Sequence, residues 1–361
     1  MSKTDPLSYT RSWSPDGEIA FFTLSDGARL RYLKTGKGPA LVLLHTLRTQ
    51  LDYFQRLIPL LANRFTIYAI DYPALGWSDI RRGAGYDEPD LRKAVVEFVE
   101  GLDLKDLTLV GESMGATLSL TASTELGERV RQIVALNSYD YPQGVERANA
   151  LAWFIVKMLR TPIVGLMFSK LSNPMILGGI MRGGFYDGRK LPEDFVREQL
   201  RSAKRPGYAS AETKYFRSLP SFIAARSLYP RVKAPATLVY GDHDWSRPEE
   251  RKQVAQLIPG SRFITLPNTG HFSALERPEE VARIVIDEAS SQKPKLRSAS
   301  RGSKTIPRSG SGRHPRPSQR SARQNYGSSP AGSSSSGTSA AAAAGASTFS
   351  GGATGCGLEL I

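Results

Sequence analysis

The sequence of 361 residues has one cysteine, Cys356, and only four histidines. A single cysteine excludes an intramolecular disulfide, and without clustered thiols we predict no metal site. Long hydrophobic runs are also absent, because basic residues interrupt the most apolar stretch, residues 150–182. None of its uncharged segments reaches the ~18 to 20 residues that span a bilayer. No transmembrane segment is therefore predicted.

The first seventeen residues, MSKTDPLSYTRSWSPDG, are polar and lack the apolar core of a secretory signal peptide. With neither an export signal nor a membrane anchor in the pattern, we expect a cytoplasmic location.

Acidic residues are scarce at one end of the chain only. The formal net charge is +14, but residues 291–361 contain ten Lys or Arg and a single acid, Glu359. The other 290 residues carry about +5, which is ordinary for a domain of that size. Residues 293–361 are rich in Ser, Gly, Ala and Arg, and we expect them to be disordered. Their arginines suit weak, salt-sensitive contacts, but no motif predicts a specific nucleic-acid partner.

The rest of the chain alternates between two kinds of segment. Two β-rich segments around Asp26-Gly27 predict a hairpin over residues 18–36. Continuous apolar runs, typical of strands buried on both faces, occupy residues 39–45, 66–72, 107–113, 133–138, 236–244 and 263–268. Amphipathic helices are predicted over residues 49–62, 90–102, 116–126, 248–258 and 278–289. This order predicts an α/β protein whose mostly parallel, eight-stranded sheet is flanked by helices.

One interval breaks the alternation. Residues 139–230 contain helix-like stretches rich in Leu, Met, Phe, Ile and Tyr but no buried-strand run. We interpret them as a helical insertion over one end of the sheet. The core is then built from residues 1–138 and residues 231–292.

Polar side chains follow the predicted strands where each of them ends. They are His45, Asp71, Ser113, Asp242 with Asp244 and, just after the last strand, His271. The carboxyl ends of parallel strands meet at one edge of a sheet, so these residues are expected to approach each other. Serine, histidine and carboxylate together suit nucleophilic acyl chemistry, since imidazole activates the hydroxyl and the carboxylate orients the imidazole.

Several short motifs, in a fixed order, resemble the α/β-hydrolase fold family. GESMG (111–115) resembles its nucleophile elbow, and LLH (43–45), DYPALGWS (71–78), GDHD (241–244) and NTGHF (268–272) match its other motifs. The resemblance covers about residues 18 to 290. It implies the α/β-hydrolase fold with a helical cap at residues 139–230 and a mechanism without a cofactor.

Roles follow from the resemblance one residue at a time. Ser113 resembles the nucleophile, His271 the general base and Asp244 the triad acid, because the acid lies three residues after glycine in this family. Asp242 stays available as an alternative acid. His243 is interpreted as a solvated loop residue, and Asp71 as a residue that fixes the turn after its strand.

The resemblance also implies an oxyanion hole built from two backbone N–H groups. The residue after the nucleophile, Met114, supplies one, and Leu47 is the candidate for the other. Thr46 stands where the family usually has glycine, and Ala74 replaces a frequent glycine in the next turn. A β-branched residue restricts the backbone at position 46.

The predicted substrate is an apolar small-molecule ester or a related carbonyl compound. Large side chains of the insertion suggest an adaptable apolar pocket, although they also suit packing between helices: Trp153, Phe154, Met158, Met167, Phe168, Met175 and Met181. The apolar stripe with several basic residues is also compatible with contact to a membrane surface. The oligomeric state is left open.

The sequence leaves alternative functions open, some of which use the same triad and one of which needs no catalytic residue. Carbon–carbon bond hydrolysis of a diketone-like substrate, and acyl transfer to an alcohol or a peroxide, need the same triad. Haloalkane dehalogenases and epoxide hydrolases are disfavoured, because those family members carry aspartate at the position of Ser113. A catalytically silent ligand-binding protein on this fold is an alternative of a different class.

Overall fold

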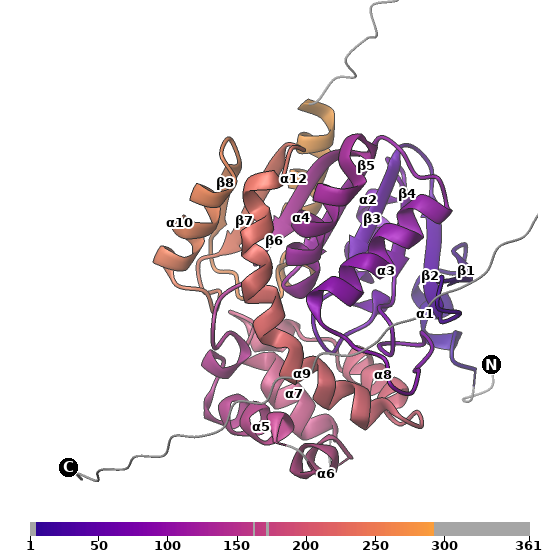
Figure 1. The fold of residues 1–361 in the computed structure, drawn as a ribbon, viewed down its shortest axis with the longest axis vertical. Coiled ribbons are helices and arrows are strands. Elements are labelled where there is room, and N and C mark those ends of the chain that lie inside the picture. Colours follow the sequence, from indigo (N-terminus) through magenta and orange to yellow (C-terminus); the bar gives the residue numbers. More distant parts are fainter. Residues whose placement is uncertain (1–4, 162, 171–172, 292–361) are drawn as a thin grey trace, which may run out of the picture. The chain divides into compact units, whose positions relative to one another are not determined.

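The computed structural model describes residues 5–161, 163–170 and 173–291. The tail predicted to be disordered, residues 293–361, and Cys356 with it, lie outside the described residues. All that follows concerns the described part, shown as a ribbon in Figure 1.

Eight strands form one sheet in the order β1-β2-β4-β3-β5-β6-β7-β8. β2 pairs antiparallel with β1 and β4, and the remaining neighbours pair parallel. The predicted hairpin is present, with Gly27 in its turn at φ 84°. The strands are β1 (Glu18–Thr23), β2 (Arg29–Gly36), β3 (Ala40–Leu44), β4 (Thr66–Ile70), β5 (Leu107–Glu112), β6 (Val130–Leu136), β7 (Ala236–Gly241) and β8 (Arg262–Leu266).

Helices cover both faces of the sheet. Successive strand residues alternate between two cores: Val42 and Leu44 pack with α3, α4 and α10, whereas Leu41 and Leu43 pack with α2 and α12. The core helices are α1 (Ser8–Trp13), α2 (Ile58–Leu61), α3 (Glu88–Gly101), α4 (Met114–Leu126), α10 (Pro248–Leu257), α11 (Ser273–Glu276) and α12 (Pro278–Ser291), with 3₁₀ turns η1 (Leu51–Phe54) and η2 (Gly127–Arg129).

The predicted helix over residues 49–62 is wrong, because only η1 and α2 are helical there. The backbone N–H of Leu51 donates to Asp71 (2.7 Å), and the Asp52 carboxylate binds the buried Arg31 (2.9 Å). These polar contacts draw the segment into the buried network, and Pro59, near the start of α2, has no N–H to continue a helix through it.

The segment between β6 and β7 is helical and gathers at one end of the sheet, below the strands in Figure 1. Its helices are α5 (Ala150–Arg160), α6 (Val164–Lys170), α7 (Pro174–Arg182), α8 (Glu193–Ala203) and α9 (Tyr208–Ala224), with 3₁₀ turns η3 (Val145–Arg147), η4 (Gly188–Lys190) and η5 (Ala225–Arg231). No helix within the described ranges is both long and apolar enough to cross a bilayer.

Candidate active site

Ser113 occupies the sharp turn between β5 and α4. Its backbone has φ 59° and ψ −117°, a conformation that non-glycine residues rarely adopt. Hydrogen bonds hold the turn: the N–H of Ser113 donates to Leu136 (2.8 Å), and its carbonyl oxygen accepts from the N–H of Tyr139 (3.1 Å). The strained conformation is therefore built into the end of the sheet.

The two glycines of GESMG are required by close backbone approach. A Cβ atom on Gly111 would lie 2.0 Å from the carbonyl oxygen of Gly115, and one on Gly115 would lie 1.9 Å from that of Leu44. Side chains at both positions would thus clash with the neighbouring helix and strand. The absence of side chains lets α4 begin against the end of β3.

The structure brings Ser113, His271 and Asp244 into one chain of hydrogen bonds. The Ser113 Oγ lies 2.9 Å from His271 Nε2, and His271 Nδ1 lies 2.5 Å from Asp244 Oδ1. Both side chains of the His271–Asp244 pair are fully buried. A carboxylate only accepts, so Nδ1–H donates to Asp244, and Nε2 is left to accept the Ser113 hydroxyl proton.

The surroundings of Asp244 favour its ionised form. Burial raises its pKa, but the charge and hydrogen bond of His271 and the hydrogen bonds of Ser246 outweigh burial and leave the pKa below its ordinary value. Behind it, the Arg251 guanidinium donates to Ser246 Oγ (2.8 Å). The carboxylate is thereby held on two sides.

Asp242 and His243 lie outside this hydrogen-bonded chain. The Asp242 carboxylate accepts the backbone N–H groups of Asn268 and Thr269, both at 3.0 Å, and so fixes the loop that carries His271. The His243 side chain is exposed and packs against Tyr186, with 4.6 Å between ring centroids. Contact with His271 therefore falls to Asp244.

Asp71 contributes to structure beside the site. Its carboxylate accepts from Arg31 Nε (2.6 Å) and from the N–H of Trp77 (2.7 Å), besides the bond from Leu51. The Arg31 side chain is fully buried between Asp71 and Asp52. As predicted, Asp71 fixes the turn after β4.

The N–H groups of Leu47 and Met114 make no hydrogen bond to any residue of the described part. Thr46 stays outside the left-handed region, and Arg48 takes φ 58° in its place, so the turn accommodates a β-branched residue. The Thr46 carbonyl oxygen accepts from His45 Nδ1 (2.8 Å), and burial lowers the pKa of His45 to about 4. A neutral His45 thus supports this turn.

Sequence reasoning missed Trp245 and Glu112. The Trp245 indole stacks on the His271 imidazole, with 3.9 Å between centroids and 16° between planes. Glu112, buried next to Ser113 in the chain, accepts from Tyr53 Oη (2.5 Å) and Asn137 Nδ2 (3.0 Å). Glu112 ends a buried apolar run, which is a signal that could have singled it out. Nothing in the sequence near Trp245 marks it.

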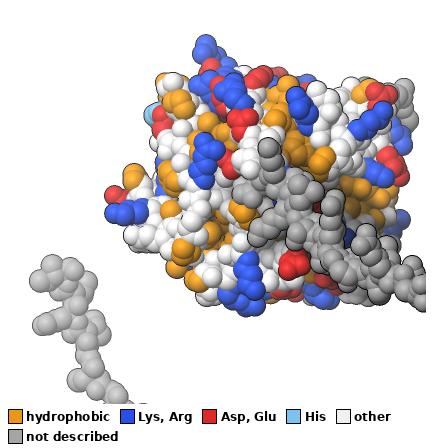
Figure 2. Space-filling model, turned by 90° about the horizontal axis from the view of Figure 1, so that it is seen from above, with side chains coloured by type: hydrophobic (Ala, Val, Ile, Leu, Met, Phe, Trp, Pro, Cys, Tyr) orange, Lys and Arg blue, Asp and Glu red, His pale blue; other side chains and the backbone are white. Residues whose placement is uncertain are grey.

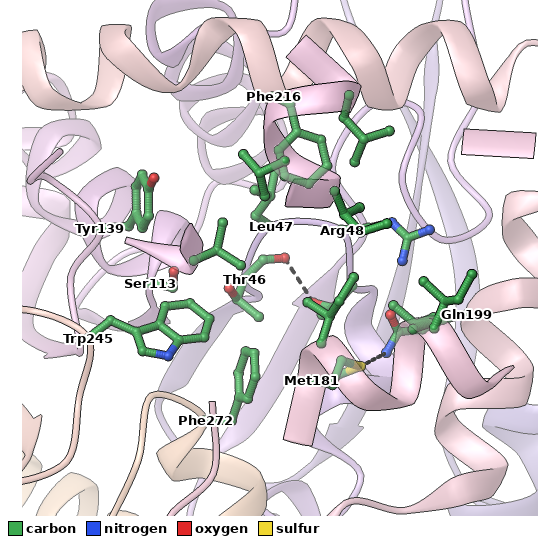
Figure 3. A pocket seen from close by; sticks show the side chains of 18 of the residues that line it. Thr46, Leu47, Arg48, Ser113, Tyr139, Met181, Gln199, Phe216, Trp245 and Phe272 are labelled. Atoms are coloured by element: carbon green, nitrogen blue, oxygen red, sulfur yellow. Dashed lines mark hydrogen bonds between the residues drawn. The ribbon is translucent and has the colours of Figure 1, made fainter. Parts of the chain in front are cut away.

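A mainly apolar cavity of about 140 Å³ opens beside Ser113. Figure 3 shows Ser113 on its wall near Trp245 and Thr46, with Arg48 and Gln199 across the cavity. The insertion supplies much of the lining: Tyr139, Val145, Ile155, Val156, Leu159, Phe168, Ile176, Leu177, Ile180, Met181, Gln199 and Phe216.

The pocket predicted from the large side chains of the insertion is correct only in part. Phe168 and Met181 line the cavity. Trp153, Phe154, Met167 and Met175 are exposed instead. They lie on the solvent side of the same helices, because apolar residues around the whole of a short helix cannot all face one cavity.

Residues 39–278 match the sequence profile of the alpha/beta hydrolase fold family. The match covers about two thirds of the chain and includes Ser113, Asp244 and His271. Together with the eight-stranded sheet it confirms the predicted fold class. The chain belongs to the α/β-hydrolase fold family.

Some relatives in sequence are named as hydrolases or dehalogenases. The chain is 27% identical to the uncharacterized hydrolase YugF of Bacillus subtilis over 68% of its own length and 88% of the relative. It is also 27% identical to haloalkane dehalogenase 2 of Mycobacterium bovis, over 75% of this chain and 94% of the relative. The crystal structure of Cfl2 from Burkholderia cenocepacia matches with a TM-score of 0.66 at 23% identity, covering 74% of this chain and 94% of that one. This last likeness concerns the fold alone.

Proposed function

We propose that the protein is a serine hydrolase that cleaves an apolar small-molecule ester, or a related carbonyl compound, through an acyl-enzyme intermediate. The observation that carries the proposal is the continuous hydrogen-bonded path from Ser113 Oγ through His271 to Asp244, with Ser113 on the wall of an apolar cavity. Nucleophile, base and orienting acid are thus aligned before any substrate arrives.

In the proposed reaction Ser113 Oγ attacks the ester carbonyl carbon while His271 Nε2 takes the hydroxyl proton. Asp244 stabilises the imidazolium, and the N–H groups of Leu47 and Met114 donate to the oxyanion. Collapse of the tetrahedral intermediate expels the alcohol, which receives the proton from Nε2. Water, deprotonated by Nε2, then attacks the acyl carbon; the acid is released as Nε2 returns the proton to Ser113 Oγ.

The helical insertion acts as the cap in this proposal, because its side chains form much of the cavity wall. An apolar wall favours an acyl or alcohol group that leaves water on binding. Gln199 is the exception, since its Oε1 is buried without a partner in the described structure while its Nε2 contacts Met181 Sδ at 3.5 Å.

The similarity to a haloalkane dehalogenase does not extend to that activity in our proposal. A carboxylate nucleophile displaces halide to form an ester, whose carbonyl water can attack. The Ser113 hydroxyl would form an ether with the same substrate, and an ether has no carbonyl carbon for water to attack. Acyl substrates avoid this dead end, so they suit a serine nucleophile.

A fluorophosphonate probe and a substrate panel test the proposal together. The panel holds esters of increasing acyl length and a vinylogous diketone. We expect the probe to label wild type, and Ser113→Ala to lose labelling and to lower ester turnover by roughly 10³-fold or more. Ser210→Ala, an exposed serine on α9, is the matched control and should behave like wild type. Full turnover by Ser113→Ala would refute the mechanism, and cleavage of the diketone alone would favour carbon–carbon bond hydrolysis.

A further inference from the structure

Exposed apolar side chains are concentrated on one part of the protein. Of the eleven large hydrophobic residues that are exposed in the described part, seven lie between residues 151 and 175. Met175 is 84% exposed, Met167 63% and Trp153 49%. We call this set the α5–α7 face; its members are Leu151, Trp153, Phe154, Ile163, Leu166, Met167 and Met175.

Contacts between the helices hold α5, α6 and α7 against one another. The rings of Phe154 on α5 and Phe168 on α6 meet edge to face, with 5.8 Å between centroids. Asn149, which caps α5, donates to the Gly179 carbonyl oxygen of α7 at 3.4 Å. Figure 1 shows the three helices close together, below the strands of the sheet. Exposed apolar surface gathered in this way marks an interaction site.

The charged residues within the segment that carries the α5–α7 face have one sign. Residues 150–182 contain four basic residues and no acidic one. Arg160 pairs with Glu146 at 2.7 Å, whereas Lys157, Lys170 and Arg182 are exposed. Lys157 Nζ lies 5.0 Å from the centre of the Trp153 ring. Basic side chains beside exposed aromatic and aliphatic ones are the pattern of a helix that lies at an anionic lipid interface.

The opposite end of the molecule is different. Looking down from above the view of Figure 1, Figure 2 shows Lys or Arg side chains next to Asp or Glu side chains among the atoms that it colours. A surface with both signs interspersed attracts an anionic sheet of headgroups less than a surface with basic residues alone. On this face, unlike within residues 150–182, basic side chains have acidic neighbours.

We propose that the α5–α7 face docks on the surface of an anionic phospholipid bilayer. A second copy of the chain fits poorly, because a symmetric contact would set basic residues against basic residues. The C-terminal tail fits poorly too, since residues 291–361 carry a net charge of +9. Lipid headgroups supply the negative charge that neither of these offers, and acyl chains receive the apolar side chains.

Docking there connects to the cavity directly. The same three helices turn their other sides to it, through Ile155 and Val156 of α5, Phe168 of α6 and Leu177 of α7. An apolar ester dissolved in the bilayer would meet the cap first. The membrane contact does not depend on the proposed chemistry, because no member of the α5–α7 face belongs to the Ser113 triad.

Sedimentation with lipid vesicles tests the docking in the full-length protein. Vesicles of phosphatidylcholine alone are compared with vesicles that also contain phosphatidylglycerol. We expect wild type to bind the anionic vesicles, and the triple variant Trp153→Ser, Met167→Gln, Met175→Gln to bind at least about tenfold more weakly. Lys157→Glu with Lys170→Glu should weaken binding by roughly tenfold or more, with a smaller loss at high salt.

Matched controls separate the face from the rest of the chain. Arg64→Glu with Lys252→Glu makes the same charge change at exposed positions outside the insertion and should leave vesicle binding within about twofold of wild type. When wild type binds vesicles, Trp153 should enter the bilayer and the tryptophan emission should shift to shorter wavelength. Trp153→Phe should still sediment with the vesicles but lose most of this shift. All these variants should hydrolyse a short, water-soluble ester as wild type does, and Ser113→Ala should bind vesicles while inactive.

Three outcomes would overturn the proposal. Wild type fails to bind anionic vesicles, or the variants of the α5–α7 face bind as wild type does, which would assign any binding to the basic tail. The third is a concentration-dependent dimer that the triple variant abolishes without any effect on vesicles, which would make the face a contact between two copies. If wild type binds the vesicles but hydrolyses no ester, the proposed function is refuted and the membrane docking is not.

Discussion

The buried carboxylate of Glu112 accepts two hydrogen bonds from Ser273, one from its backbone N–H and one from its hydroxyl, both at 2.6 Å. Glu112 precedes Ser113 in the chain, and Ser273 follows His271 by two residues. Asn137 adds to this link, because its Nδ2 donates both to Glu112 and to the His271 carbonyl oxygen (3.2 Å). The distance between Ser113 and His271 thus depends on a buried network that touches neither reacting atom.

Replacing Glu112 with glutamine should disturb this link. All the partners of Glu112 donate, so an amide NH₂ would face backbone N–H groups that cannot turn away. We expect the free energy of unfolding in urea to fall by about 1–3 kcal/mol and kcat to fall by roughly tenfold. Glu128→Gln, at an exposed position, is the control and should change neither quantity. Wild-type values for both in Glu112→Gln would contradict a positioning role.

Asp244→Asn and Asp242→Asn form a matched pair on one loop. An amide at position 244 can donate to His271 Nδ1, which favours the tautomer whose Nε2 carries the proton and cannot accept from Ser113. We therefore expect kcat of Asp244→Asn to fall by about 10⁴-fold. Asp242→Asn keeps an oxygen for one of the two loop N–H groups, water can reach the other at this partly exposed position, and the variant should stay within about threefold of wild type. Steady-state kinetics on one ester decides, and equal losses would reassign the acid.

Trp245 should act through the ring that it stacks on His271. An aromatic face stabilises an adjacent cation by about 0.5–2 kcal/mol, and imidazolium forms in the proposed transition state. Trp245→Leu should accordingly lower kcat by roughly 3- to 30-fold, while Trp245→Phe restores much of the loss. Trp245 also lines the cavity, so kcat and KM are measured separately. A change in KM alone would limit Trp245 to substrate binding.

Asp140 should make stability depend on pH. It is buried, the Tyr229 hydroxyl donates to it at 2.6 Å, and burial raises its pKa to about 6 from an ordinary 3.8. Because the folded pKa is raised, the stabilising contribution is complete below pH 4 and is lost as pH rises through 6. Relative to Asp140→Asn, wild type should lose about 3 kcal/mol of unfolding free energy between those limits.

Urea unfolding of both proteins from pH 4 to pH 7.5 measures this difference, and other groups that titrate cancel in the comparison. If the unfolding free energies of wild type and Asp140→Asn changed with pH in the same way, Asp140 would have the same pKa in the folded and the unfolded chain, and the prediction would be wrong.

Arg31 should be a large contributor to stability because two carboxylates depend on it. Arg31→Met leaves Asp52 and Asp71 buried without their cation, and we expect unfolding free energy to fall by about 3–5 kcal/mol. Arg29→Met removes an exposed ion pair with Asp79, which solvent screens, and should cost far less than Arg31→Met. Similar losses from both, measured by urea unfolding, would contradict the role assigned to the buried cluster.

Local patterns predicted most of the fold because they reflect local physics. The alternation of apolar runs and amphipathic segments corresponds to the eight strands and to helices α3, α4, α10 and α12. The predicted helix over residues 49–62 is wrong because its polar groups bond to Asp71 and Arg31, which are distant in sequence. The exposure of Trp153 and Met175 could not be predicted from the sequence either, since composition does not tell which side of a helix faces a cavity.

What the sequence by itself determined is the fold family and the identity of Ser113, Asp244 and His271 as candidates, because glycines, turn residues and strand ends leave local marks. Tertiary structure decided the rest. In the folded chain Asp244, and not Asp242, contacts His271, and the Trp245 indole stacks on the His271 imidazole. Glu112 is buried and bonds to Ser273, which follows His271 by two residues. These contacts join β5, β7 and the loops after β7 and β8, and such long-range packing depends on the order in which the strands lie side by side in the whole sheet.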